Sequence, residues 1–530
     1  MNQEIENAPV IPEIESSCHI VAAIDIGSNL IRMVIAEVLG DGSLHILEQL
    51  QRAVRLGHDT FRRGRLTGQT MRAAIVVLRD YRRKIDFYQI THLRAVATSA
   101  VREASNSDTF LERVSIATGI DIEPIDPAEE SRLTVSAVCR NLDEQIVGKD
   151  TNLLIAEVGG GSTLLTILKN AKIKASQSIP LGSLRLQEAL ATVNEPPEKS
   201  ADILSLQIRN EVEDLKKTLP LKHVQTFIAL GGDARFAARQ IGKVSSSADL
   251  RLVKQTAFRK LIKQCLAHSP EELVTKFGLP FSNAETMNSA LLIYQSLLDV
   301  MQIRQFFVSH ISMRDGLLLD LIHRVTGQED EILNRGVIES AFSIAEKYRV
   351  NLEHARKVEN MAVALFDELQ AEHQLNTRHR LLLRVAAILH ETGDYISSRA
   401  HHKHSYYVIM NSEIFGLNRD ELTKVALIAR YHRRAIPKST HPEYMSLARE
   451  RRMVINKLAA LLRVADALDA AHIQQVEALR FERQEEEFVI YVSGVHDLSL
   501  ERRSIGQKGD LFEDIFGLRV RLEEDEQTSK

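Results

Sequence analysis

The chain has 530 residues, 44% hydrophobic and 26% charged, an ordinary globular balance that excludes a collagen-like or largely disordered protein. At roughly 150 residues per domain, this length predicts three to four domains. The formal net charge of -4 excludes a generally basic protein, so we expect no nucleic-acid partner, although local basic patches can still bind polyanions.

Signals for membrane insertion or export are missing from the pattern. No apolar run approaches the roughly 18–20 residues of a membrane span, so we expect no membrane partner. The first twenty residues carry four glutamates and no Lys or Arg, unlike a signal peptide. The cysteines, Cys18, Cys139 and Cys265, are far apart and lack metal-binding spacing, which predicts free thiols in a reducing compartment. We therefore expect a cytoplasmic protein.

The first 320 residues alternate between strand-like and helix-like patterns. Residues 1–19 carry prolines and scattered acids and predict a loose tail. The apolar run 20–25 ends in an acid and a turn, and similar runs ending in glycine recur among helical stripes such as 71–78. Strands alternating with helices indicate an α/β fold, in which we expect two lobes, 20–135 and 136–322.

Beyond residue 330 the strand signals fade. Apolar residues at helical spacing, as in 382–389 and 458–465, predict an all-helical domain over residues 331–477. Period-two alternation returns in residues 478–530 and predicts a small C-terminal domain that contains β-strands. Histidines and basic residues at 401–404 and 430–438 fit either an electropositive channel wall for a polyanion or a solvated helix face.

A weak internal repeat is the most informative feature of the α/β region. Residues 23–29 and 155–163 each combine a strand-like approach, an acid, an aliphatic residue, a glycine-led turn and a second apolar run. The acids, Asp25 and Glu157, stand about one domain apart. Two such units predict duplicated halves that face one cleft.

The composition of the two turns suits phosphate. Glycine lets the backbone approach closely, and successive N–H groups of a turn make a concave anion site. Asp25 and Glu157 can hold Mg²⁺ or its waters through hard oxygen ligands. Two ordinary hairpin turns are the alternative, but the matched pair favours phosphate. The phosphate-binding candidates of the turns are Gly27, Ser28, Asn29, Gly159, Gly160, Gly161, Ser162 and Thr163.

These residues resemble a known family. The two turns are similar to the phosphate loops of the superfamily that contains actin, sugar kinases and the heat-shock ATPase. The chain resembles more closely the exopolyphosphatase/guanosine-pentaphosphatase family, from about residue 20 to about residue 525. The matching stretches are 23–29, 97–104, 129–133, 158–163 and 314–318, in the family's order.

The resemblance implies a fold and an activity. The fold is two ribonuclease-H-like, actin-like ATPase lobes around a cleft, followed by an all-helical domain and a small β-containing one. The activity is Mg²⁺-dependent hydrolysis of the terminal phosphate of inorganic polyphosphate or guanosine pentaphosphate, which the sequence does not separate. The resemblance also implies a homodimer.

Two catalytic assignments follow from the resemblance. Glu130 matches the family's general base, which deprotonates water for in-line attack on the end phosphorus. Taken alone, the acids after Asp126 and Pro127 fit a helix N-terminus that complements the helix dipole. Arg102 matches a phosphate clamp that stabilises transition-state charge, with a surface ion pair to Glu103 as the alternative.

A third glycine site follows the apolar run 227–230. Gly231 and Gly232 resemble the family's glycine-rich loop, but Asp233 and Arg235 stand where small or hydroxyl residues are usual. The loop either binds phosphate or only closes a helix against a strand.

Three departures from the family's pattern concern activity. Glu157 stands where Asp is usual, Leu164 where Glu is usual, and Leu30 where a hydroxyl residue is usual. Phosphate binding through backbone N–H groups survives these changes, whereas metal placement is altered. A catalytically weakened sensor of guanosine polyphosphates or polyphosphate is therefore the alternative function.

The helical domain offers a second possible site. It resembles the His-Asp phosphohydrolase fold that longer family members carry, and the matching residues are His354, His390, Glu391 and Asp466. The acid after His390 is Glu instead of Asp, a poor replacement in a tight metal cluster, so we expect an inactive relic. Metal-dependent phosphoester hydrolysis at this cluster is the competing hypothesis.

Overall fold

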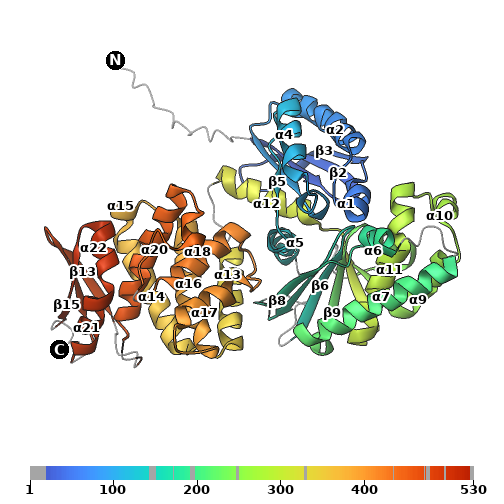
Figure 1. Ribbon diagram of the computed structural model, residues 1–530. Helices are drawn as coiled ribbons and strands as arrows, with labels where there is room; N and C mark the ends of the chain where they lie inside the picture. The colour runs from blue at the N-terminus through green and yellow to red at the C-terminus, as the bar shows by residue number, and fades with distance from the viewer. Residues whose placement is uncertain are drawn as a thin grey trace, which may run out of the picture.

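The computed structural model describes residues 19–141, 151–170, 172–190, 197–245, 250–326, 331–433, 435–470, 472, 478–494 and 497–525. The predicted tail lies outside the described residues except for His19. Two α/β lobes stand one above the other, and a helical part lies to their side (Figure 1). No helix among the described residues is long and apolar enough to cross a membrane.

The first lobe is a five-stranded sheet with the order β3-β2-β1-β4-β5. The first three strands form an antiparallel meander, and β4 and β5 run parallel to β1. This is the strand order of a ribonuclease-H-like fold, so the predicted fold class is confirmed. The strands are β1 His19–Ile26, β2 Leu30–Val38, β3 Leu44–Ala53, β4 His92–Ala97 and β5 Glu123–Pro124.

Helices cover both faces of this sheet. One face packs under α2 and α4, where the stripe predicted at 71–78 supplies the buried residues of α2. The other face packs against α5 and α12. The helices of this region are α1 Leu56–Arg63, α2 Gly68–Phe87, α3 Ser99–Arg102, α4 Ser107–Thr118 and α5 Pro127–Arg140.

The second lobe repeats the plan within a seven-stranded sheet, ordered β10-β11-β12-β9-β6-β7-β8. Its meander β6-β7-β8 is antiparallel, and β9 and β12 continue in parallel next to β6, as β4 and β5 do next to β1. The predicted internal repeat is therefore present as structure. The strands are β6 Asn152–Val158, β7 Thr163–Lys169, β8 Lys172–Ile179, β9 Thr226–Leu230, β10 Lys243–Val244, β11 Leu250–Lys254 and β12 Gln305–Ser309.

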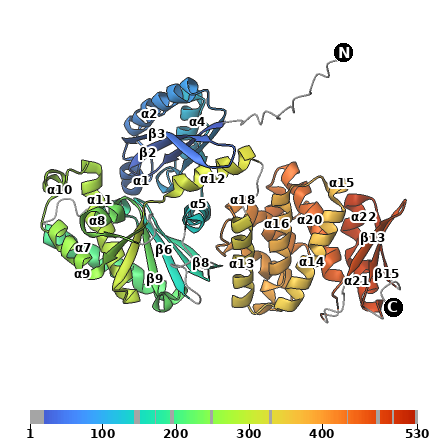
Figure 2. The same ribbon diagram turned by 180° about the vertical axis from the view of Figure 1, so that it is seen from behind.

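The helices of the second lobe pack mainly on one face of its sheet, where they form a large apolar core. They are α6 Ser183–Leu190, α7 Pro197–Thr218, the 3-10 helix η2 Leu221–His223, α8 Gly232–Ile241, α9 Gln255–Leu266, α10 Pro270–Phe277 and α11 Phe281–Met301. The opposite face packs against α5, which thus lies between the two sheets (Figure 2).

Helix α12, Met313–Thr326, returns to the first lobe although it follows the second in sequence. The predicted lobe boundary at residue 322 assigns most of this helix to the second lobe. Its buried residues Leu317, Leu318 and Leu321 instead pack with Val21 and Val96 of the first sheet. A stripe of apolar residues at helical spacing indicates that one face of a helix is buried, but it does not indicate which sheet covers that face.

The remaining chain is helical and then mixed, as predicted. Its helices are α13 Glu331–Lys347, α14 Leu352–Glu368, α15 Gln370–His373, α16 Thr377–Leu389, η3 Thr392–Tyr395, α17 His401–Met410, α18 Arg419–Arg430, α19 Pro442–Met445 and α20 Arg449–Ala467. The last segment comprises β13 Leu479–Arg483, β14 Glu487–Val492, α21 Ser499–Lys508, α22 Asp510–Phe516 and β15 Arg519–Glu524. One apolar core joins both segments, from Val337 to Leu522.

Candidate active site

Two equivalent hairpin turns form the base of the site. In each, the N–H two residues after the acid donates to the carbonyl five residues after it: Gly27 to Leu30 O at 3.0 Å, and Gly159 to Ser162 O at 2.9 Å. The acids hold matching registers, Asp25 opposite Arg32 and Glu157 opposite Leu164. The sequence repeat is thus a repeat of backbone geometry.

The turns open into a cavity of about 590 Å³ between the lobes. The cavity brings together nearly all the residues predicted for phosphate and metal binding, and Thr98 and Ser99 join them from the loop after β4. The predicted residues that line it are Asp25, Gly27, Ser28, Asn29, Glu130, Glu157, Gly159, Gly160, Gly161, Ser162, Gly231 and Gly232.

The second turn presses against the first lobe. A Cβ atom built on Gly161 would lie 2.1 Å from Ser99 Oγ and 2.6 Å from the Phe61 ring, so only glycine fits there. On the first-lobe side of this contact, Ser28 Oγ lies 3.3 Å from Ser99 Oγ. The glycine in this turn therefore sets how closely the two lobes approach at the cavity.

The third glycine turn carries a backbone conformation that favours glycine. Gly231 has φ +99° and precedes α8, and a Cβ on it would meet Val158 O at 3.2 Å. The Tyr294 hydroxyl donates to Leu230 O and accepts from the Val158 N–H at 3.0 Å. The turn thus closes a helix against two strands and also lines the cavity.

Three carboxylates converge in the cavity, those of Asp25, Glu130 and Glu157. Burial raises the pKa of Glu130 to about 7; the Arg102 guanidinium opposes the shift, and the Glu157 and Asp25 carboxylates add to it. Burial also raises the pKa of Glu157, against its hydrogen bond from Thr134 Oγ1 at 3.1 Å. A carboxyl group with a pKa near neutral pH is suited to accept a proton.

The same cluster suits a divalent cation. Asp25 and Glu157 offer carboxylate oxygens from equivalent ends of β1 and β6, and their repulsion of the Glu130 charge is the kind that a bound cation relieves. Asp25 Oδ2 also accepts from Arg32 at 3.1 Å, which leaves the second oxygen for an ion. These residues therefore fit Mg²⁺.

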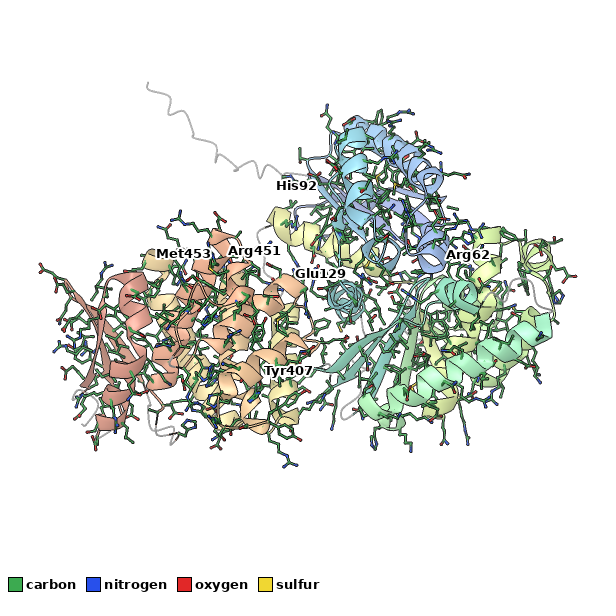
Figure 3. All side chains as sticks on the ribbon, in the orientation of Figure 1. Arg62, His92, Glu129, Tyr407, Arg451 and Met453 are labelled. Carbon is green, nitrogen blue, oxygen red and sulfur yellow. The ribbon has the colours of Figure 1, made fainter. Side chains whose placement is uncertain are left out.

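The two acids at the start of α5 point to different surroundings. Glu129 accepts from Arg132 Nε at 2.6 Å and from Arg94 Nη2 at 2.7 Å, and these arginines also pair with Asp320 of α12. Burial raises the pKa of Glu129, but the hydrogen bonds and charges of Arg132 and Arg94 outweigh it and lower the pKa to about 2. In Figure 3, Glu129 is labelled on α5 close to α12. Glu129 thus stabilises the packing of the helices, and Glu130 faces the cavity.

Three predicted side chains have partners other than phosphate in the structure. Arg102 Nη1 donates to Glu130 Oε1 and to Ile125 O, each at 2.5 Å, while Glu103 pairs with Arg185. The Thr163 hydroxyl is buried and donates to Leu181 O at 2.5 Å. The Asn29 amide donates to Ser282 O at 2.6 Å.

Arginines on the cavity wall were not assigned phosphate-binding roles from the sequence. Arg32, Arg235 and Arg314 line the cavity from β2, α8 and α12. Arg235 and Arg314 form no ion pair with a described residue, and burial lowers the pKa of both guanidinium groups. Arg235 was noted only as a departure beside the third glycine turn, and Arg314 only as part of the matching stretch 314–318. Nothing in the sequence pattern singled out Arg32.

The departures from the family's pattern also face the cavity. Leu30 and Leu164 both line it, and Leu164 is almost fully buried. Asp233 lines it too, and burial raises the pKa of that carboxyl to about 6. The wall beside the turns is therefore partly apolar at the position where a carboxylate is usual.

The four residues predicted in the helical domain also come together. His354 lies on α14, His390 and Glu391 follow α16, and Asp466 lies on α20. His390 Nε2 is 3.6 Å and His354 Nε2 is 3.7 Å from Asp466 Oδ1. Of the basic residues proposed to line a channel here, Arg430 pairs with Glu443 at 3.3 Å, and Arg434 lies outside the described residues.

Comparisons with known proteins agree with this geometry. Residues 34–325 match the model of the Ppx/GppA phosphatase family, and residues 338–503 match that of Ppx/GppA phosphatase, domain III. Among curated proteins, the chain is similar to the guanosine-5'-triphosphate,3'-diphosphate pyrophosphatase of Vibrio vulnificus (strain YJ016), with 25% identity over 436 residues, 81% of this chain and 83% of that one. The protein of the same name from Aliivibrio fischeri (strain MJ11) is 24% identical over 447 residues, 83% of this chain and 86% of its own.

Among solved structures, the exopolyphosphatase from Cytophaga hutchinsonii superposes on this chain with a TM-score of 0.52. The two are 24% identical, and the match covers 58% of this chain and 98% of the other. At this identity the likeness concerns the fold.

Proposed function

This chain belongs to the Ppx/GppA phosphatase family, and on that premise we propose that it releases the terminal phosphate of inorganic polyphosphate or guanosine pentaphosphate. It is a phosphoric anhydride hydrolase, in keeping with the names of its relatives.

One observation carries the proposal. Glu130 is a buried carboxyl inside the interlobe cavity with a pKa of about 7, next to two glycine turns that present backbone N–H groups. A general base works best when its pKa lies near the working pH. The adjacent Glu129 has the same chemistry but is ion-paired away from the cavity.

The residues of the cavity have separate roles in the proposed in-line attack. The N–H groups of the turns hold phosphate oxygens. The guanidiniums of Arg235 and Arg314, which form no ion pair with another described residue, offset the phosphate charge. Glu130 orients a water against the end phosphorus and accepts its proton. Arg102 acts as a positioning residue, because its bond to Glu130 Oε1 leaves the carboxylate one defined orientation. A Mg²⁺ ion held by Asp25 and Glu157 would supply further neutralisation of phosphate charge.

The arginines favour a substrate with several phosphates. Three guanidinium groups from three elements line one cavity, with Arg32 also paired to Asp25, and together they can contact more than one phosphoryl group. Polyphosphate and guanosine pentaphosphate both carry such a chain of negative charges. We propose no preference between them.

A second function is favoured by the leucines of the wall. Leu164 and Leu30 remove one carboxylate and one hydroxyl from the surroundings of the turns. With these changes the site can still bind phosphate through the backbone N–H groups of the turns while it loses the ability to hydrolyse it. The protein would then be a sensor that binds guanosine polyphosphates or polyphosphate without hydrolysis.

One assay separates these functions. Phosphate release is measured from polyphosphate and from guanosine pentaphosphate, with Mg²⁺ and with Mn²⁺, for the unmodified protein and for Glu130→Gln. Turnover that disappears in the folded variant supports the hydrolase. Tight binding of either compound without turnover under both cations identifies the sensor, and unchanged turnover in the variant removes Glu130 as the base.

We further propose that the protein acts as a homodimer in the cytoplasm. The support is the family resemblance and the few, widely spaced cysteines of the sequence, which suit a reducing compartment.

A further inference from the structure

Three consecutive carbonyl groups of the second glycine turn are held by the start of α6. Backbone N–H groups of residues 183–185 donate to Gly159 O at 2.9 Å and to Gly160 O at 2.9 and 3.0 Å. The next carbonyl is held by a side chain, because Arg185 Nε donates to Gly161 O at 2.6 Å. All three carbonyl groups therefore point toward α6.

The direction of these carbonyl groups also sets the direction of the N–H groups that follow them. The peptides of the turn are trans, and in a trans peptide the C=O and N–H bonds point to opposite sides. The N–H groups of Gly160, Gly161 and Ser162 therefore point away from α6. None of them donates to a described residue, and all three residues line the interlobe cavity. They are the donors that this turn offers to a phosphate.

The three peptides differ in what holds them. Gly159 O and Gly160 O accept from backbone N–H groups, which no substitution in α6 short of proline removes. Among the described residues, Gly161 O accepts only from the Arg185 side chain. The orientation of the Ser162 N–H group thus depends on one guanidinium.

The guanidinium of Arg185 is itself fixed by the first lobe. Its Nη2 donates to both carboxylate oxygens of Glu103 at 2.7 Å, and its Cζ lies 4.3 Å from the centre of the Phe61 ring. The planar fork of an arginine can make these contacts and the bond to the turn at the same time. Phe61 belongs to α1, which lies against α6 where the lobes meet (Figure 1).

The partner Glu103 connects this arginine with the proposed general base. Glu103 directly follows Arg102, whose guanidinium donates to Glu130. Arg185 does not line the cavity, so it does not reach a phosphate held there. Its contacts instead join the second glycine turn to the segment that orients the base.

We propose that Arg185 is a positioning residue for the hydrolysis, which fixes the Ser162 N–H group against the phosphate chain. This role rests on the proposed function. Without the guanidinium, the Gly161–Ser162 peptide is free to rotate, because glycine permits many backbone conformations. A phosphate bound at the turn then shifts relative to the water that Glu130 orients.

Kinetics of phosphate release from polyphosphate test this role. Arg185→Met keeps a long side chain next to Phe61 but removes every hydrogen bond of the guanidinium. It should lower kcat by about 10²-fold, the cost of a displacement of about 1 Å at a reacting centre. KM should stay nearly unchanged, because the arginines of the cavity wall still bind the chain. Arg185→Lys, which retains a donor for Gly161 O, should recover part of the loss.

Two comparison variants separate positioning from stability. Glu103→Gln removes the same ion pair but leaves the bond to Gly161 O, so it should lower the urea midpoint about as much as Arg185→Met and keep most of its kcat. Arg259→Met is the matched control for the substitution itself. Arg259 is another arginine of the second lobe, paired with Asp299 at 2.6 Å and outside the cavity, and its variant should have the kinetics of the unmodified protein.

A crystal structure of Arg185→Met provides a readout that needs no turnover. The Gly161–Ser162 peptide should be rotated or poorly ordered in this variant and in place in Glu103→Gln. The proposal is overturned if the peptide is unchanged, or if Arg185→Met and Glu103→Gln have equal kcat values. An unmodified protein that releases no phosphate counts against the hydrolase assignment alone, because the orientation of the peptide is still measured.

Discussion

The interlobe cavity and the histidine cluster of the helical domain, His354 and His390 beside Asp466, both contain buried carboxyl groups, but the pKa values of these groups are shifted in opposite directions. In the cavity, Glu130 and Glu157 have raised pKa values, because burial and neighbouring carboxylates disfavour their charge. In the cluster, Lys508, His354 and His390 hold the pKa of Asp466 well below its usual range in spite of burial. Against the same burial, the carboxylates of Asp466 and Asp469, the latter hydrogen-bonded to the ring, raise the pKa of His354 to about 9.

The difference teaches what each site is suited to do. The cavity has carboxyl groups with raised pKa values, a volume of about 590 Å³ and two arginines that form no ion pair with a described residue, which suits proton transfer on a polyanion. The cluster instead consists of buried charged groups held by hydrogen bonds and ion pairs.

The largest effect should come from neutralising the base in the cavity. Glu130→Gln should lower phosphate release by about 10²–10⁴-fold, the usual contribution of a general base, when measured as kcat with saturating polyphosphate. Its neighbour is the control: Glu129→Gln should retain activity per folded molecule but lower the free energy of unfolding by roughly 1–3 kcal/mol, because buried arginines lose a partner. Equal losses of activity in both variants would remove the distinction between the two acids.

Widening the junction of the lobes should have the next effect. Gly161→Ala places a methyl group against Ser99 and Phe61 and should displace the second turn. A shift of about 1 Å at a reacting centre lowers kcat/KM by roughly 10²-fold. Gly40→Ala, where a Cβ meets nothing within 4 Å, is the matched control for the methyl group. A Gly161→Ala enzyme with normal kinetics would contradict the role given to this contact.

Removing the guanidinium group of Arg235 should weaken substrate binding. Arg235→Met should raise KM for polyphosphate by roughly 10–100-fold, the value of one charge-assisted hydrogen bond. Raising the salt concentration should reduce the difference between the two proteins, because the interaction is electrostatic. If KM is unchanged at low salt, the arginine binds no phosphate.

The smallest effect is a displacement of the pH profile. Glu130 must be deprotonated to act, so activity should rise as the pH passes about 7, the pKa of this carboxyl in the folded protein. The Arg102 guanidinium lowers that pKa, and Arg102→Gln should therefore move the acid limb upward by about one pH unit. Initial rates between pH 5 and 9 measure the limb.

Folding stability should depend on the same carboxyl with the opposite sign. The folded protein keeps the Glu130 proton up to about pH 7, whereas the unfolded chain loses it near the ordinary value of 4.5. The free energy of unfolding should thus fall as the pH rises through this window, less so in Glu130→Gln. Urea unfolding at pH 5 and pH 8 checks the sign.

Much of the candidate cleft could be predicted from the sequence, because its parts are local. A turn that follows an acid, as in residues 25–29 and 157–163, makes its hydrogen bond within five residues, so a short segment specifies the whole feature. The alternation of strands and helices likewise indicated two duplicated α/β lobes, and the apolar stripes indicated the helical domain. The order of the elements followed from these patterns.

Other features were decided only by the tertiary structure. The family resemblance singled out Glu130, but the physical difference from Glu129 arises only in the fold. Arg94 and Asp320 approach one side of α5, and the cavity lies on the other. Asp469 and Lys508 likewise gain their partners from elements distant in sequence. The sequence determined which turns and helices form, since local hydrogen bonds and periodicity dictate them. Which side chains meet depends on how those elements pack, and packing sums contacts over the whole chain.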